Sequence, residues 1–389
     1  MTILLLTLAL FLVYLVYERI ALNRLRKAIP MVVSVTGTRG KSSVVRMLAS
    51  VLRESGRTVL AKTTGSQAQF VLPDGTVRDV PRRGIASILE QKKVLRKAAE
   101  LHADYLVVEI MSIHPENHVV ESHQILKPNI VVLTNIRPDH TDAMGETEEE
   151  IARVLSLDIS AGAKVYVPRE MWDQLTPSIA QVPRVTPVSV ARGTSNPLLR
   201  QDPKLQKKEF AENLDLVASV ARDFGIDDAT IAKGILGATQ DIGKFRVWTY
   251  RAGGKEVLLV NAFAANDPES TMRVMEKARE MITAGSTAFI GLLNLRSDRG
   301  DRTQQWIEAL SNGLAGHFKR IYVIGEHANV VRRKVKGVEV IKRMRPEEMT
   351  NSIVSDIEEG GVLFGFGNIG GAGQRLVGHW QRVGEEYGV

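Results

Sequence analysis

The sequence predicts an α/β protein with two domains and a membrane helix. The first domain is expected to hold a doubly wound, mostly parallel sheet with a phosphate-binding loop, and the second a smaller α/β sheet. A β-branched run at 31–35 breaks into a glycine-rich loop and then a helical pattern. Further apolar runs alternate with helical stretches, as in parallel sheets with crossover helices. An apolar segment, 1–17, carries no charged side chain.

Length and composition limit the classes of function. The chain has 389 residues, more than one ordinary core accommodates, so two domains and an appendage are expected. Its formal charge of +7 suggests an anionic partner, namely a nucleotide, an acidic substrate or a membrane surface. No aromatic RNA-binding platform accompanies the charge, so nucleic acid is not an expected partner. The absence of cysteine excludes disulfides, thiolate metal sites and a thiol nucleophile.

The N-terminal segment is long enough for a short membrane span. No basic segment precedes it and no small-x-small site follows it, which disfavours a cleaved signal peptide. Cationic residues follow on its C-terminal side, and the positive-inside rule then places the rest of the chain in the cytoplasm. The alternative is an apolar helix docked within the protein. The expected domains are the anchor with its basic flank (1–27), an ATPase domain (28–242) and a C-terminal domain (243–389).

The first strand leads into the sequence TGTRGKSS. In such a P-loop, backbone N–H groups and a positive helix end converge on phosphate, Lys41 reaches the β- and γ-phosphates, and the Ser42 hydroxyl binds Mg²⁺. Val35 stands where the longer motif has its first glycine, but the shorter form T-G-T-x-G-K-S fits. A chance loop is the alternative. The predicted ATP-binding residues here are Thr36, Gly37, Thr38, Arg39, Gly40, Lys41, Ser42 and Ser43.

The remaining elements follow from periodicity and turn signals. Expected strands of the first domain are 58–62, a hairpin at 70–80, 104–109, 129–135 and 163–167. Expected helices are the stretch after the loop up to Gly56, then 84–102, 146–162, 204–225 and 227–239. Six prolines in 168–203 predict mostly surface loop. Strands of the second domain are expected near 245–250, 257–261, 287–294, 321–324 and 362–366.

Polar groups follow three of these strands, where ligands of open α/β sheets collect. Glu109 closes the run YLVVE and can hold Mg²⁺, or else cap a helix or form a salt bridge. His140 lies in NIRPDHTD, as a metal ligand or a hydrogen-bonded loop residue. The third segment, NAFAANDPES (261–270), contains an ordinary Asp-Pro helix start.

Together the motifs GTRGKS, VVEIMS, TNIRPDHTD and KFRVW with an Asn-Asp-Pro turn resemble the Mur ligase superfamily, over about 31–389. Those enzymes activate a carboxylate with ATP and join it to an amine. The N-terminal anchor, the lack of a UDP-sugar-binding domain before the loop, and EIMSIHPE narrow the resemblance to poly-γ-glutamate synthases of the PgsB/CapB type. The segments LNLRSDRGDRT and GFGNIGGAG are also similar to that subgroup.

The resemblance implies a Mur-ligase-like central domain, a Rossmann-like C-terminal domain, and glutamate joined through its γ-carboxylate via an acyl phosphate. It implies ATP and Mg²⁺ as cofactors, with Mn²⁺ as an alternative ion. Implied magnesium ligands are Ser42, Glu109 and His140. Implied nucleotide contacts are Lys41, Asn213, Asn261, Asn266 and Asp267. Arg246 and the cluster Arg296, Asp298 and Arg299 are expected as charge partners on the second domain, with a solvated basic surface as the alternative.

Mur ligases usually carry a carbamylated lysine near the position of Leu155, whereas no lysine lies between His140 and Lys164 here. A second Mg²⁺ would therefore have to be held differently.

Expected partners are glutamate, the growing chain, the membrane and small integral-membrane subunits, and a homo-oligomer is left open. Basic runs at 82–83, 92–93 and 332–345 guide the polyanion or form solvated faces. The rival function is a membrane-anchored nucleotide-binding regulator or kinase of capsule machinery.

Overall fold

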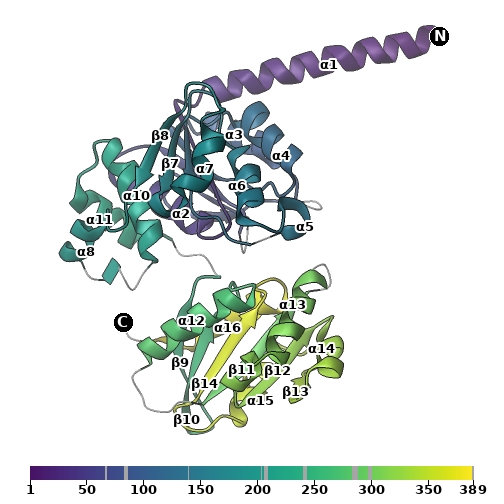
Figure 1. Cartoon of the computed structure of the whole chain (residues 1–389), viewed down its shortest axis with the longest axis vertical. Helices are drawn as coiled ribbons and strands as arrows, with labels where there is room; N and C mark the ends of the chain where they lie inside the picture. The colour runs from purple at the N-terminus through teal and green to yellow at the C-terminus, as the bar shows by residue number, and fades with distance from the viewer. Residues whose placement is uncertain are drawn as a thin grey trace. The chain divides into compact units, whose positions relative to one another are not determined.

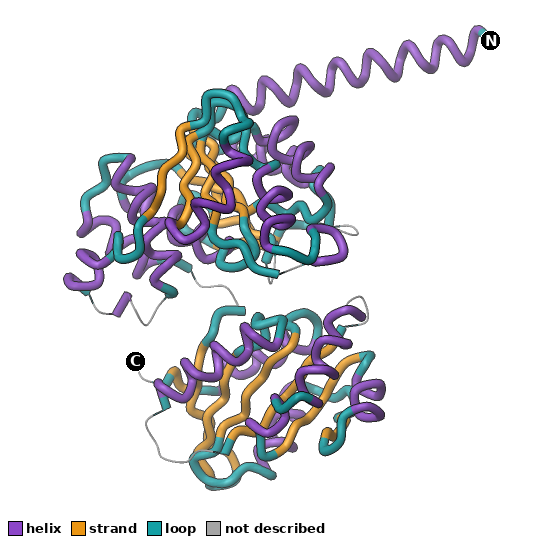
Figure 2. The backbone as a smooth tube through the Cα atoms, viewed as in Figure 1, coloured by secondary structure: helices purple, strands orange, loops and turns teal. Residues whose placement is uncertain are grey.

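The computed structural model describes residues 1–65, 68–82, 86–138, 140–202, 204–205, 209–239, 243–282, 288–296 and 300–387. The chain forms two compact units, Met1–Gln240 and Asp241–Val389 (Figure 1). In each unit a central sheet lies between helices, as the strands in Figure 2 show. The two units are described separately below.

An eight-stranded sheet forms the centre of the first unit, in the order β4-β3-β2-β5-β1-β6-β7-β8. Its six strands from β2 to β8 in that order are parallel, and β3 and β4 add an antiparallel edge. The strands are β1 (Met31–Thr36), β2 (Val59–Thr63), β3 (Gln69–Val71), β4 (Val77–Asp79), β5 (Tyr105–Glu109), β6 (Ile130–Leu133), β7 (Lys164–Pro168) and β8 (Thr186–Val190).

Helices cover both faces of this sheet. They are α1 (Thr2–Lys27), α2 (Lys41–Glu54), α3 (Glu90–Glu100), α4 (Pro115–Val119), the π-helix η1 (Val120–Leu126), α5 (Thr141–Met144), α6 (Glu148–Ser156), the 3₁₀ turn η2 (Arg169–Met171), α7 (Trp172–Ile179), α8 (Asn196–Gln201), α10 (Ala211–Asp223) and α11 (Asp228–Gly237).

Side-chain alternation along the strands builds a core on each side of the sheet. Val33 and Val132 pack with α2, α10 and α11 on one face. Their neighbours Val32 and Val131 point to the other face, where they join separate clusters with α3 and α6. Because both faces are buried, the central strands read as continuous apolar runs.

Helix α1 has two parts. Its residues up to Tyr17 are exposed, and the helix is long and apolar enough to be a candidate membrane span. Its last turns are bonded to the first unit: Arg26 donates to the main-chain oxygens of Leu126 and Lys127 at 2.7 and 2.9 Å, and Glu18 pairs with Lys92. The end of the helix is therefore part of the folded unit.

The second unit has a seven-stranded sheet in the order β13-β12-β11-β14-β10-β9-β15. The first five strands in that order are parallel. β9 is antiparallel to its neighbour β10, and β15 is antiparallel to β9. The strands are β9 (Arg246–Ala252), β10 (Lys255–Asn261), β11 (Phe289–Leu295), β12 (Arg320–Gly325), β13 (Val338–Val340), β14 (Val362–Gly367) and β15 (Glu385–Glu386).

Two helical layers enclose this second sheet. The helices are α12 (Pro268–Met281), α13 (Gly300–Ser311), the 3₁₀ turn η3 (Leu314–His317), α14 (Ala328–Lys334), α15 (Pro346–Ser355) and α16 (Ala372–Val383). Val260 packs with α12 and α13 on one side of the sheet, and Leu259 packs with α15 and α16 on the other.

The predicted fold class is confirmed, and the structure corrects several elements. For 168–203 the sequence predicts mostly surface loop with short pieces of structure, and the structure identifies those pieces as η2, α7, β8 and α8. Strand β8 is an edge strand with partly exposed side chains, so it lacks the apolar run of a central strand. Residues 84 and 85 of the predicted helix 84–102 lie outside the described residues. The rest of that helix shortens to α3, and 146–162 shortens to α6, because amphipathic spacing continues past the ends of the hydrogen-bonded turns. Strands β13 and β15 are too short to show a pattern.

Helix α11 packs against α2 at a glycine, which leads to a stability prediction. A Cβ at Gly234 would lie 2.5 Å from the Cα of Val51, a backbone atom that cannot turn away. We expect Gly234→Ala to lower the free energy of unfolding by about 1–3 kcal/mol, measured by urea denaturation. Gly237→Ala on the same helix is the control, because its Cβ would lie 3.8 Å from Ser50. Equal effects of both substitutions would contradict this packing.

Candidate functional site

The P-loop connects the end of β1 to the start of α2. The first helical hydrogen bond runs from the Val44 N–H to the Gly40 oxygen at 3.0 Å. The N–H groups of the first helical turn therefore have no partner within the helix and can receive an anion. Lys41 Nζ donates to the oxygen of Gly37 at 2.6 Å, so the ammonium lies over the loop itself.

Two loop positions require glycine. Gly37 has φ +120°, and a Cβ there would lie 2.2 Å from the hydroxyl of Thr134. Gly40 has φ +81°, and its Cβ would lie 2.6 Å from Oδ1 of Asn213. Both φ values lie in the region that side chains other than glycine rarely adopt. The second contact places the side chain of Asn213, which α10 supplies, directly beside the P-loop.

Asn135 connects the P-loop to the segment that follows β6. Its Oδ1 accepts bonds from the hydroxyl of Thr38 at 2.7 Å and from the N–H of Arg39 at 3.0 Å. Its Nδ2 donates to the Arg39 oxygen at 3.1 Å, and its main-chain oxygen accepts from the Thr38 N–H at 3.1 Å. These four bonds hold the tip of the loop in one conformation.

Glu109 ends β5, and its Oε2 accepts three hydrogen bonds. The donors are the Ser42 hydroxyl at 2.7 Å and the N–H groups of Thr64 and Gly65 at 2.7 and 3.3 Å. The start of α2 and the ends of β2 and β5 therefore meet at one carboxylate, which is almost completely buried.

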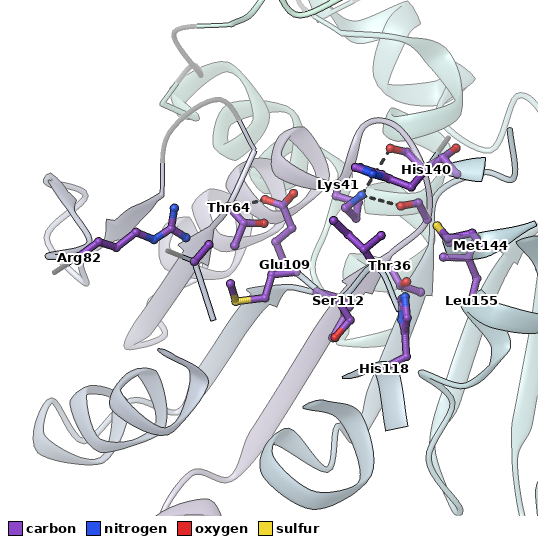
Figure 3. A pocket seen from close by; sticks show the side chains of 16 residues that line it. Thr36, Lys41, Thr64, Arg82, Glu109, Ser112, His118, His140, Met144 and Leu155 are labelled. Carbon is purple, nitrogen blue, oxygen red and sulfur yellow. Dashed lines mark hydrogen bonds between the residues drawn. The ribbon is translucent and has the colours of Figure 1, made fainter. Parts of the chain in front are cut away.

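A cavity of about 200 Å³ opens beside the P-loop and contains several of the predicted site residues. Figure 3 shows Lys41 between Glu109 and His140 in this cavity. Ser42 joins the group through its bond to Glu109. The lining residues are Thr36, Gly37, Thr38, Lys41, Thr64, Arg82, Ala86, Glu109, Ile110, Met111, Ser112, Ile113, His118, His140, Met144 and Leu155.

Within the described ranges, no group of three His, Cys, Asp or Glu residues is placed to hold a metal. Two of the three predicted metal ligands, Glu109 and His140, are of these residue types. The third is the hydroxyl oxygen of Ser42. A sparse set of this kind suits Mg²⁺, which keeps several waters and binds phosphate oxygens. The donor chemistry therefore fits an ion held together with a nucleotide.

Sequence reasoning missed a buried polar cluster at the same cavity. His118, from α4, lines the cavity, and its Nδ1 lies 2.9 Å from Oδ1 of Asp158. Asp158 also accepts from the hydroxyls of Ser122 and Thr36. No sequence pattern links His118 to Asp158, because 40 residues separate them and the fold alone brings them together.

The charges around this cluster act on the pKa of His118 in opposite directions. Burial opposes the charged form, but the neighbouring Asp158, by its charge and hydrogen bond, and Glu121 outweigh burial and raise the pKa of His118 above its usual value. Lys41 acts in the opposite direction. Burial likewise raises the pKa of Glu121, against the hydrogen bonds from Ser112 and Gln91.

The other predicted site residues belong to the second unit. Asn261 is buried, donates to the Lys244 oxygen at 2.8 Å and accepts from the Phe263 N–H at 3.3 Å. Asp267 caps α12 through the N–H and hydroxyl of Ser270, both at 2.8 Å. These bonds give both side chains a structural role.

Three basic side chains are expected near substrate, and two of them, Arg246 and Arg296, lie within the described residues. Arg246 begins β9, and Arg296 follows β11 beside Gly370. Arg299 and Asp298 lie outside the described residues, as do Asp139 and Arg83. Arg82, in one of the basic runs, is paired with Glu90 at 2.7 Å, so it is not simply a solvated charge.

Comparison with known proteins decides the family. The Mur ligase middle domain matches residues 35–163, and the poly-gamma-glutamate synthase CapB C-terminal domain matches residues 247–383. The capsule biosynthesis protein CapB of Bacillus anthracis is 31% identical over 386 residues, covering 94% of this chain and 79% of that protein. The chain belongs to the CapB family. PGA synthase CapB of Bacillus subtilis is 30% identical and covers 90% of each chain.

Solved structures agree on the fold of this CapB-family chain. Escherichia coli FolC in complex with ADP has a TM-score of 0.67 at 16% identity and covers 96% of both chains. The folylpolyglutamate synthase/dihydrofolate synthase of Yersinia pestis, complexed with AMPPNP and Mn, also has a TM-score of 0.67, at 15% identity. The predicted Mur-ligase-like fold is confirmed. The family membership also confirms the predicted enzyme class, an ATP-dependent amide ligase.

The Asn135 bonds predict how the P-loop of this CapB-family protein responds to mutation. Asn135→Ala removes three side-chain hydrogen bonds, each worth about 0.5–1.5 kcal/mol. We expect the Kd for ATP to rise about tenfold or more, measured by calorimetry. Asn129→Ala is the control, since Asn129 accepts bonds from the Val32 N–H and Arg26 away from the loop. Equal weakening of ATP binding by both would show a general loss of stability.

Proposed function

We propose that this protein polymerises glutamate through its γ-carboxylate, using ATP and forming an acyl phosphate, with ADP and phosphate released. The observation that carries the proposal is the cavity in which the P-loop lysine, Lys41, meets Glu109 and His140. Its support from the comparisons is the match to a PGA synthase over 90% of both chains. Poly-γ-glutamate is the product that this name implies.

In the first step the γ-phosphoryl group of ATP passes to a glutamate carboxylate. Such a transfer needs positioning and charge neutralisation more than covalent help. The N–H groups at the start of α2 bind the phosphates, and Lys41 turns from the Gly37 oxygen to the transferred group. Asn213, beside Gly40, is a proposed nucleotide contact.

Ser42, Glu109 and His140 are the proposed ligands of Mg²⁺ or Mn²⁺. When bound, the ion neutralises charge on the phosphate oxygens. Glu109 is already oriented by the N–H groups of Thr64 and Gly65, so its carboxylate needs little rearrangement. Arg246, Asn261, Asp267 and Arg296 are proposed contacts for nucleotide or substrate in the second unit.

The amine of another glutamate then attacks the acyl phosphate, and the amide forms as phosphate leaves. No protein nucleophile is required, in agreement with a chain that has no cysteine. We place the enzyme at the cytoplasmic face of the cell membrane, held by α1, whose apolar part is exposed. Small integral-membrane subunits are proposed as partners, since one helix forms no pore for a polyanion.

The products test the proposed reaction. Protein incubated with ATP, Mg²⁺ and glutamate should yield ADP, phosphate and a γ-linked peptide, detected by mass spectrometry. Lys41→Ala should lower turnover at least about 100-fold without unfolding the chain, because the developing phosphoryl charge loses its cation. AMP with pyrophosphate would contradict the acyl phosphate, and phosphoprotein or free phosphate without an amide would favour the kinase or regulator.

The metal ligands are tested separately with His140→Ala. We expect the Mg²⁺ concentration for half-maximal turnover to rise about tenfold or more, because one ligand is lost. His114→Ala is the control, since His114 is exposed and is not among the residues lining the cavity. An unchanged Mg²⁺ dependence of the His140 variant would remove His140 from the ligand set.

A further inference from the structure

The buried pair His118 and Asp158 has no role in the steps described above. His118 is 1% exposed, and among the described residues its Nε2 has no hydrogen-bond partner. A buried polar atom without a protein partner costs free energy unless a water, an ion or a substrate bonds to it. The ring lines the cavity that also holds Lys41, and Figure 3 shows it on the side of Thr36 away from Glu109.

The hydrogen bonds of Asp158 determine which ring nitrogen carries a proton. Its carboxylate accepts from the hydroxyls of Thr36 and Ser122, so it acts as an ionised acceptor. Nδ1 of His118, 2.9 Å away, must then be the donor N–H. In the neutral ring Nε2 consequently carries the lone pair, the arrangement by which a carboxylate orients a histidine base.

We propose that His118 is the general base of amide formation and that Asp158 positions it. This inference rests on the proposed function, because it requires an acyl phosphate and an incoming amine. The amine nitrogen forms a bond to the acyl carbon, and the carbonyl electron pair moves to oxygen. His118 Nε2 takes one proton from that nitrogen. The carbonyl re-forms as the C–O bond to phosphate breaks, and the proton passes from His118 to the departing phosphate.

The surroundings suit a base that must hold a proton briefly. Asp158 and Glu121 stabilise the imidazolium and raise the pKa of His118, against burial and the charge of Lys41. Phosphate groups beside Lys41 would offset the effect of its charge. Glu109 and His140 also line the cavity, but they are proposed to act on the metal and therefore on phosphoryl transfer. A base with a pKa near the working pH is the most effective.

Hydroxylamine separates this inference from the proposed function. It traps an acyl phosphate as a hydroxamate, and as a weakly basic nucleophile it needs no base. The experiment uses the full chain with ATP, Mg²⁺ and glutamate, and measures hydroxamate and peptide in parallel. For His118→Asn we expect the peptide-to-hydroxamate ratio to fall about 100-fold or more, as loss of a general base predicts.

The pH dependence supplies a second readout. The wild-type peptide-to-hydroxamate ratio should fall as the pH drops through the raised pKa of His118, because the protonated ring is no base. In His118→Asn the ratio should fall only as the attacking amine itself becomes protonated, without the additional fall that His118 causes. Asp158→Asn should keep the fold and lower the ratio at every pH, since the ring loses its fixed tautomer. If thermal denaturation shows that His118→Asn is unfolded, the same measurements are made on His118→Gln, whose longer side chain also ends in an amide.

The outcomes distinguish the two hypotheses. If wild type forms neither hydroxamate nor peptide, the acyl-phosphate ligase itself is wrong. If wild type forms both and folded His118 variants lose both equally, His118 acts in phosphoryl transfer or only in structure, and the base assignment is overturned. A pH profile of the ratio that His118→Asn leaves unchanged would overturn it as well.

Discussion

The carboxylate of Glu109 is the constraint on which the site depends. It ends a buried strand and accepts bonds from the first turn of α2 and from the main chain after β2. Three segments far apart in the sequence are thereby fixed relative to one another at the carboxyl edge of the sheet. Parallel strands and a crossover helix put them near each other, and the carboxylate bonds to all three. A neutral side chain there would leave two N–H groups without a charged acceptor.

Sequence reasoning predicted much of this site because its parts carry local signals. The P-loop follows from the order of a β-branched strand, glycines and a helix start, and Glu109 and His140 from their positions after apolar strands. Of these residues, one cavity is lined by Thr36, Gly37, Thr38, Lys41, Glu109 and His140, and Ser42 bonds to Glu109 beside it. Elements with weak periodicity were missed, such as β8 at the sheet edge and the π-helix η1. β8 forms by pairing with β7, and η1 packs with α3 and α4, so neither leaves a local pattern in the sequence.

The buried cluster shows what sequence reasoning could not reach. No sequence motif contains His118, Ser122 and Asp158 together, because the hydrogen bonds that join them span 36 to 40 residues of chain. Histidines and aspartates are common in loops, and their chemistry changes only when burial and a partner shift their protonation. Asn261 and Asp267 also bond to main-chain groups in the structure, which no sequence pattern indicated, and their nucleotide contacts stay a prediction.

The docking of α1 divides that helix into two segments with different tolerances to change. Before Glu18 no side chain is buried, so hydrophobic residues there can be exchanged for one another with little effect on the enzymatic fold. After it, Leu22 belongs to a core cluster and Arg26 binds main-chain oxygens. The candidate membrane helix therefore runs into the first unit through buried and hydrogen-bonded contacts, so its last turns contribute to the stability of that unit.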